Sequence, residues 1–132
     1  MRIRFAKHLL LMLVAWVGPH MTSASTSDSA AFRLCSSNVA QVSLVEESSG
    51  AVVHVQLAED ASFEFGQFTR DIAGMMLVVL AGNEVLFRAV VQVPIDSGLL
   101  RSPVLSTAEA ARVKQEIKVD RPLNECGRNS IE

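Results

Sequence analysis

The sequence predicts a small α+β domain, a single mainly antiparallel sheet with two helices packed on one face. Apolar and polar residues alternate over 39–45 and 51–57, as in half-buried strands. Between Glu59 and Ala73 the apolar residues recur at a helical spacing instead. A continuous apolar run, Met75 to Leu80, then has the length and composition of a strand covered on both faces. The predicted order along the 132-residue chain is β-β-α-β-β-(β)-α.

The first two strands form a predicted antiparallel hairpin whose turn lies at 46–50. Successive side chains of a strand point to opposite faces of the sheet, so the apolar positions mark the buried face. The residues expected to face the core are Val42, Leu44, Val53, Val55 and Leu57. Those expected on the opposite face are Gln41, Ser43, His54 and Gln56.

One apolar stripe defines the first helix, and its members are Ala61, Phe65, Phe68 and Ile72. Glu59 and Asp60 lie in the first turn, where negative charge complements the helix dipole. Gly74 follows the stripe and is well placed to end the helix. Phe63 lies off the stripe, so it is either at the edge of the core or an exposed contact.

The second hairpin is predicted around the Gly82-Asn83 turn, because both residues tolerate the backbone angles of a tight turn. Its first strand is the apolar run up to Leu80, and its second runs from Val85 until Pro94 ends it. A short edge strand is expected within 99–105, since a proline, here at position 103, cannot donate to a strand ladder.

A capping box predicts the start of the second helix at 106–109, with the sequence Ser-Thr-Ala-Glu. Ala110, Val113 and Ile117 supply its buried stripe. The helix is expected to end before Pro122, and residues 127–132 are expected to form a polar tail.

The N-terminus has the pattern of a secretory signal peptide over 1–24. A basic start is followed by the apolar stretch Leu9 to Val17, about half of the roughly 20 residues that span a bilayer. A cleaved signal is therefore favoured over a membrane anchor, with cleavage after Ala24 or, as an alternative, after Ala31. We expect a flexible leader over 25–34, a single domain over 35–126, and a periplasmic or secreted protein without a stable membrane span.

Charge argues against some partners. Loss of Arg2, Arg4 and Lys7 with the signal leaves fewer basic than acidic residues, because the whole chain has 12 Lys and Arg against 14 Asp and Glu. Nucleic acid and anionic membrane surfaces both attract a basic patch, so neither is an expected partner.

Two cysteines, Cys35 and Cys126, lie near the two ends of the predicted domain. In an exported protein such a pair indicates a disulfide. Two free thiols are the plain alternative. A redox or metal role is not favoured, because the chain has no C-x-x-C motif and no histidine cluster.

The sequence offers no catalytic, metal-binding or cofactor-binding constellation, and we expect a protein that is not an enzyme. His54 is the one histidine that remains after signal removal, and an exposed strand face explains it better than a hydrolase site does. The acidic pairs Glu46-Glu47 and Glu59-Asp60 are explained by a turn and by a helix start. No phosphate-binding glycine loop is present.

About half of the chain, from Val53 to Ile117, nevertheless resembles a known family. The matching segments are Val55-Gln56-Leu57, Phe68-Thr69, Met76 to Leu80, Gly82 to Leu86, Ala89-Val90-Val91, Pro94-Ile95 and Ser106 to Ala110. In these segments the chain resembles the P1 head subdomain of SecD, a subunit of the bacterial Sec protein-export machinery.

The sequence also departs from that family. Ala89-Val90 stands where the family has Ala-Pro, Ala58-Glu59 replaces a Thr-Pro helix start, and the glycine-rich loop is reduced to Ser97-Gly98. The family's transmembrane helices and second periplasmic subdomain, which the resemblance associates with proton-coupled movement of an emerging chain, have no counterpart in this sequence.

The resemblance therefore implies only the non-catalytic role of the head. We expect an exported binding module that contacts exported or unfolded polypeptide; the alternative is a structural or regulatory subunit of an envelope protein complex. The candidate partner contacts are Phe63, Phe87, Leu99 and Leu100.

Overall fold

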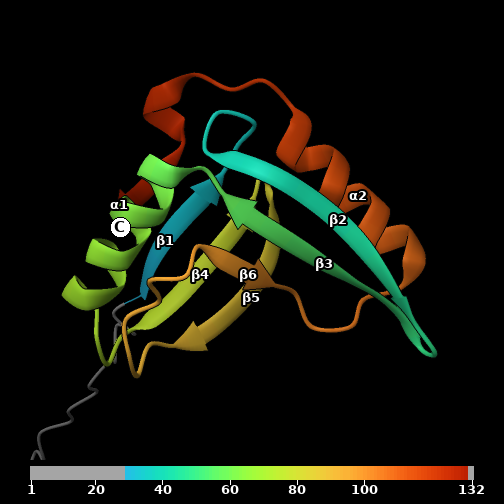
Figure 1. Cartoon of the computed structure of the whole chain (residues 1–132), viewed down its shortest axis with the longest axis horizontal. Coiled ribbons are helices and arrows are strands. Elements are labelled where there is room, and N and C mark those ends of the chain that lie inside the picture. Colours follow the sequence, from blue (N-terminus) through green and yellow to red (C-terminus); the bar gives the residue numbers. More distant parts are fainter. Residues whose placement is uncertain (1–28, 131–132) are drawn as a thin grey trace, which may run out of the picture.

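The computed structural model describes residues 29–130 (Figure 1). In chain order the elements are β1 (Ser29–Leu34), β2 (Val39–Glu47), β3 (Gly50–Leu57), α1 (Glu59–Asp71), β4 (Met76–Ala81), β5 (Glu84–Val90), β6 (Leu99–Arg101), α2 (Thr107–Lys118), the short 3-10 helix η1 (Leu123–Glu125) and β7 (Gly127–Ser130). The predicted α+β class is confirmed.

The strands form two sheets instead of the single predicted one. Sheet A has the order β5-β4-β1-β7, and sheet B has the order β2-β3-β6. Both are mainly antiparallel, but β1 and β4 run parallel, from the pair Ser29 and Met76 to the pair Leu34 and Ala81. A parallel neighbour needs a crossover connection, and here β2, β3 and α1 all lie between the two strands in the sequence.

One core lies between the two sheets and the two helices. Sheet A contributes Phe32, whose ring contacts the α1 side chains Phe65 and Phe68 at centroid distances of 4.8 and 5.7 Å. The predicted stripes of both helices are buried, as are Val53, Val55 and Leu57 of β3. Figure 1 shows α1 beside β1 and α2 alongside β2, so the helices lie at opposite ends of this core.

The expected leader over 25–34 is wrong from Ser29 onward. Residues 29–34 form β1, in the interior of sheet A between β4 and β7. Phe32 and Leu34 are fully buried, because their side chains point into the core. The sequence did not predict this strand, because small polar residues precede it and its partner strands, β4 and β7, are distant in the sequence. Cleavage after Ala31 would remove the first residues of this strand; Ala24 and the rest of the predicted signal lie outside the described residues.

The expected polar tail is wrong as well over Gly127–Ser130, which forms β7 and pairs antiparallel with β1. This strand lacks apolar residues because it lies at the edge of sheet A. Arg128 nevertheless holds it to α1, with a 3.0 Å bond from its guanidinium to Asp71 and its charge 4.8 Å from the ring of Phe68. The ordered domain therefore extends beyond the predicted range 35–126 at both ends.

The predicted helix boundaries are confirmed by their caps. Ser106 precedes α2, and its hydroxyl oxygen accepts a 3.1 Å hydrogen bond from the Glu109 amide, as an N-cap residue does. Gly74 follows α1 with a φ of 87°, a conformation that favours glycine. The predicted edge strand within 99–105 is shorter than expected, with β6 ending before Ser102 and only one further bridge, between Leu105 and Ala51.

Candidate functional site

The outer face of sheet B carries a hollow of about 390 Å³, which we call the sheet B hollow. Its lining residues come from all three strands of the sheet: Gln41, Ser43, His54, Val55, Gln56, Leu99, Leu100 and Arg101. The four polar residues that the sequence places on one strand face are all among them.

Strand register brings these side chains together. Ser43 pairs with His54, and His54 in turn pairs with Arg101 on the other side of β3. In the next row Gln56 lies between Gln41 and Leu99. Side chains directly opposite each other in an antiparallel sheet project from the same face, so two cross-strand rows line the hollow.

The hollow is rich in hydrogen-bonding groups and contains one permanent positive charge, the guanidinium of Arg101. Arg101 makes only a long 3.9 Å contact with Glu47, and both side chains are exposed, so most of its donor capacity remains available. No carboxylate is among the described residues that line the hollow. The site therefore suits a ligand that offers carbonyl or carboxylate oxygens.

A hydrolase centre would need more than the hollow provides. Ser43 lies directly opposite His54 in the register. Within residues 29–130, however, no hydrogen bond joins the two side chains, and no acidic group in the lining orients the imidazole. The absence of an enzyme activity stays a prediction.

The edge of sheet B beside the hollow is short. The backbone of residues 98 and 102 bonds to β3, through Gly98 to Leu57 at 2.9 Å and through Ser102 to Val53 at 3.0 Å. Backbone groups alternate in direction along a strand, so those of Leu99 and Arg101 point to the open side of β6. Only these two residues offer main-chain groups there before Pro103 interrupts the strand.

The predicted partner contacts are distributed unequally. Phe63 is 72% exposed and Leu99 is 60% exposed, which resolves Phe63 as a surface residue. Ser62, which precedes Phe63, lies close to Gly98, which precedes Leu99, since an added Cβ at Gly98 would collide with the hydroxyl of Ser62. Phe63 and Leu99 are therefore on neighbouring segments of the chain.

The other two predicted contacts turn toward the core. Leu100 is 5% exposed, because alternate residues of β6 point to opposite faces, and its assignment as a partner contact is corrected. Phe87 is half-buried and packs against the core. It follows Leu86, which is also a core residue, after a break in the β4–β5 register.

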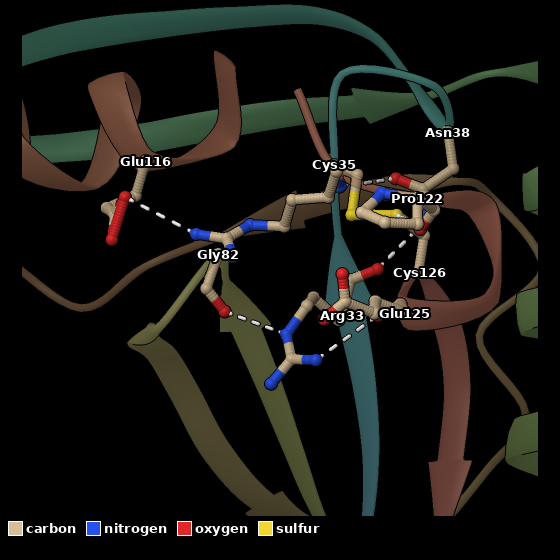
Figure 2. Close-up of a disulfide and its surroundings, with 9 residues drawn as sticks. Arg33, Cys35, Asn38, Gly82, Glu116, Pro122, Glu125 and Cys126 are labelled. Carbon is tan, nitrogen blue, oxygen red and sulfur yellow. Dashed lines mark hydrogen bonds and ion pairs between the residues drawn. A yellow bond between two sulfur atoms is a disulfide. The ribbon is translucent and has the colours of Figure 1, made fainter. Parts of the chain in front are cut away.

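A second polar cluster surrounds the predicted disulfide, which joins Cys35 and Cys126 (Figure 2). Arg33 donates from Nε to the Gly82 carbonyl at 2.9 Å and from Nη1 to the Glu125 carbonyl at 3.2 Å. Figure 2 shows these bonds linking β1 to the β4–β5 turn and to η1. Because both Arg33 bonds end on backbone carbonyls of the scaffold, this cluster ties β1 to the β4–β5 turn and to η1.

Over residues 29–130 there is no group of three or more His, Cys, Asp or Glu side chains arranged to hold a metal ion. No helix in this range has the length and apolar character needed to cross a bilayer. The disulfide indicates an oxidising compartment.

No family model, curated protein or solved structure matches the chain. The likeness to the SecD head stays an expectation drawn from short segments.

Arg101 is the residue of the hollow that sequence reasoning missed. Its sequence neighbours are Leu100 and Ser102, and nothing in that stretch shows that it lies beside His54. The signal that could have found it is the strand alternation of Leu99, Leu100 and Arg101, combined with the antiparallel return of this segment onto β3.

Proposed function

We propose that this protein is an exported, non-enzymatic module that binds extended polypeptide in the sheet B hollow. The observation that carries the proposal is the lining itself: amide, hydroxyl, imidazole and guanidinium groups around an exposed leucine, with no carboxylate among the described lining residues. Such a lining satisfies the carbonyl and amide groups of a peptide without depending on one particular side-chain sequence.

The edge of β6 adds a backbone component to this binding. An extended chain beside β6 would meet the outward main-chain groups of Leu99 and Arg101. The short edge and Pro103 limit the pairing to a few bonds, so side chains of the hollow must supply the rest. Leu99 and the nearby Phe63 offer apolar contact surface. We expect weak, sequence-tolerant binding.

The compartment supports a polypeptide in transit as the ligand. The disulfide indicates an oxidising location, and the signal-like N-terminus favours export to the periplasm or the exterior. Unfolded exported chains occur there. The segments that resemble the SecD head point to the same class of partner, and a link to protein translocation is part of this proposal.

Titration of the secreted form with unfolded exported polypeptides tests the function. We expect saturable binding, and we expect Arg101→Gln to weaken it about 10-fold, as for loss of one charge-assisted hydrogen bond. Arg112→Gln is the matched control, because Arg112 is an exposed arginine on α2 that pairs with Glu84 away from the hollow. Absence of saturation at high micromolar concentration, or equal loss in both variants, would contradict the proposal.

A second candidate, a subunit of an envelope complex with a folded partner, is favoured by the 72% exposure of Phe63. Leu99, 60% exposed, lies on a neighbouring segment, and a contiguous exposed apolar patch commonly marks a protein contact. Crosslinking in the native envelope separates the two candidates. Capture of many unrelated exported chains supports the polypeptide-binding module, whereas one dominant partner lost in Phe63→Ser supports the subunit.

A further inference from the structure

The other edge strand of sheet B, β2, is long and has no strand on its outer side. Sheet B has the order β2-β3-β6, so β2 has a strand neighbour on one side only. It contains nine residues and no proline, and its only irregularity is a register shift between Val39 and Gln41. Proteins normally shorten, charge or cover such an edge, because it is a template for pairing with another strand.

The register identifies which groups of β2 are free to pair. Ala51 and Val53 on β3 direct their backbone bonds away from β2, toward β6 and the segment after it. The residues opposite them, Glu46 and Leu44, therefore direct their own N–H and C=O groups to the open side. Val42 does the same, two residues earlier. Three alternate residues thus present unpaired backbone groups along this edge.

The side chains of these three residues lie on the helix side of the sheet. Val42 and Leu44 pack against the core and are half-buried, so Glu46 projects from the same side. A groove between β2 and α2 runs past Val42, and its α2 wall is formed by Ile117 and Lys118. The open edge therefore has a negative charge at one end and a positive charge at the other.

We propose that two copies of this chain pair through their β2 strands, antiparallel and with Leu44 opposite Leu44 on a twofold axis. In this register Val42 of each copy lies opposite Glu46 of the other, so all three outward residues exchange backbone hydrogen bonds. A shift by two residues in either direction would bring the register shift near Ala40 or the turn at Ser48 into the pairing and would lose bonds.

Charge complementarity selects a second copy as the occupant. Glu46 of one copy comes to lie beside Val42 of the other, and hence at the Lys118 end of that copy's groove. Within residues 29–130, neither Glu46 nor Lys118 takes part in an ion pair of its own chain. Because of the twofold symmetry, the pair of Glu46 from one copy and Lys118 from the other forms twice, once in each half of the interface.

Pairing also enlarges the proposed binding surface. Gln41 and Ser43 line the sheet B hollow and belong to β2, so a β2–β2 contact places the two hollows on one face of a continuous sheet. The dimer itself does not depend on the proposed function, since its contacts lie at the edge and on the helix side.

Sedimentation of the secreted form over a range of concentrations tests the pairing without any polypeptide. We expect a monomer–dimer equilibrium, and we expect E46K and K118E each to raise the dimer dissociation constant about 10- to 100-fold, because each places like charges together twice. An equimolar mixture of the two variants should recover the dimer, because each copy then meets an opposite charge at both positions.

Glu47→Lys is the matched control, since its side chain projects from the opposite face one residue later. It should change the dissociation constant by less than about threefold. Circular dichroism and a melting curve confirm that each variant is folded. A wild-type chain that stays monomeric at its highest soluble concentration, a dimer insensitive to E46K and K118E, or a mixture that fails to recover it would each overturn the proposal.

Discussion

The two sheets differ in how firmly their strands are tied to the rest of the fold and in what their surfaces present. In sheet A, β1 has a strand on each side, its end is tied by the disulfide, and Arg33 bonds to the β4–β5 turn and to η1. In sheet B, the outer face is hollow and polar. On our proposal, sheet A holds the fold together, while the side chains on the outer face of sheet B are free for binding. Substitutions in sheet A should therefore lower the free energy of unfolding, whereas substitutions on the outer face of sheet B should weaken polypeptide binding.

The largest expected effect is the loss of an aromatic ring from sheet A. Phe32→Ala removes a fully buried ring that contacts Phe65 and Phe68, and should lower the free energy of unfolding by about 3–5 kcal/mol. Gln56→Ala in sheet B should change it by less than about 0.5 kcal/mol while weakening polypeptide binding. Urea denaturation measures the first quantity. Similar losses of stability in both variants would contradict the division between a stabilising sheet A and a binding sheet B.

Removal of the disulfide is the next largest effect. The Cys35→Ser, Cys126→Ser double variant opens a loop with a sequence separation of 91 residues and should lose about 2–5 kcal/mol. Affinity at the sheet B hollow should stay unchanged at temperatures where the variant is folded, because the bond lies in the scaffold cluster (Figure 2). Denaturation and titration of the same sample check both statements. A loss of affinity without a loss of stability would assign the disulfide to the binding site.

A smaller effect is expected at the start of α2, the helix that contacts both sheets. Ser106→Ala removes the hydroxyl that accepts a hydrogen bond from the Glu109 amide, and should cost about 1 kcal/mol. Ser49→Ala, in the exposed β2–β3 turn, is the matched control and should cost less than about 0.5 kcal/mol. The melting temperatures of the two variants are compared. Equal shifts would mean that the cap contributes nothing specific.

Phe63→Ala should have the smallest effect on stability, less than about 0.5 kcal/mol, since the ring is 72% exposed. Any function of Phe63 must then appear in binding. A stability loss comparable to that of Phe32→Ala would show that Phe63 belongs to the core.

The elements that the sequence predicts well are those defined by local patterns. The stripes of α1 and α2 follow from helical spacing, and the alternation in β2 and β3 correctly separates a buried face from a polar one. The N-cap at Ser106 and the positive-φ glycine after α1, Gly74, are equally local. In each case one short segment contains all the information.

The elements that the sequence hides depend on distant partners. β1 pairs with β4 and β7, which are distant in the sequence, and β7 itself has no apolar residue that would mark it as a strand. The hollow likewise depends on the register between His54 and Arg101. Pairing between distant segments is decided by the whole fold, and single-strand patterns do not specify it.

The central claim, that sheet B is the binding sheet, is tested most directly by backbone NMR during titration with an unfolded exported polypeptide. The account predicts that amide shifts change at the strands of the hollow, in particular at Ser43, His54 and Arg101, and stay constant in β1 and β4. Shift changes confined to sheet A, or none at saturating polypeptide, would contradict it.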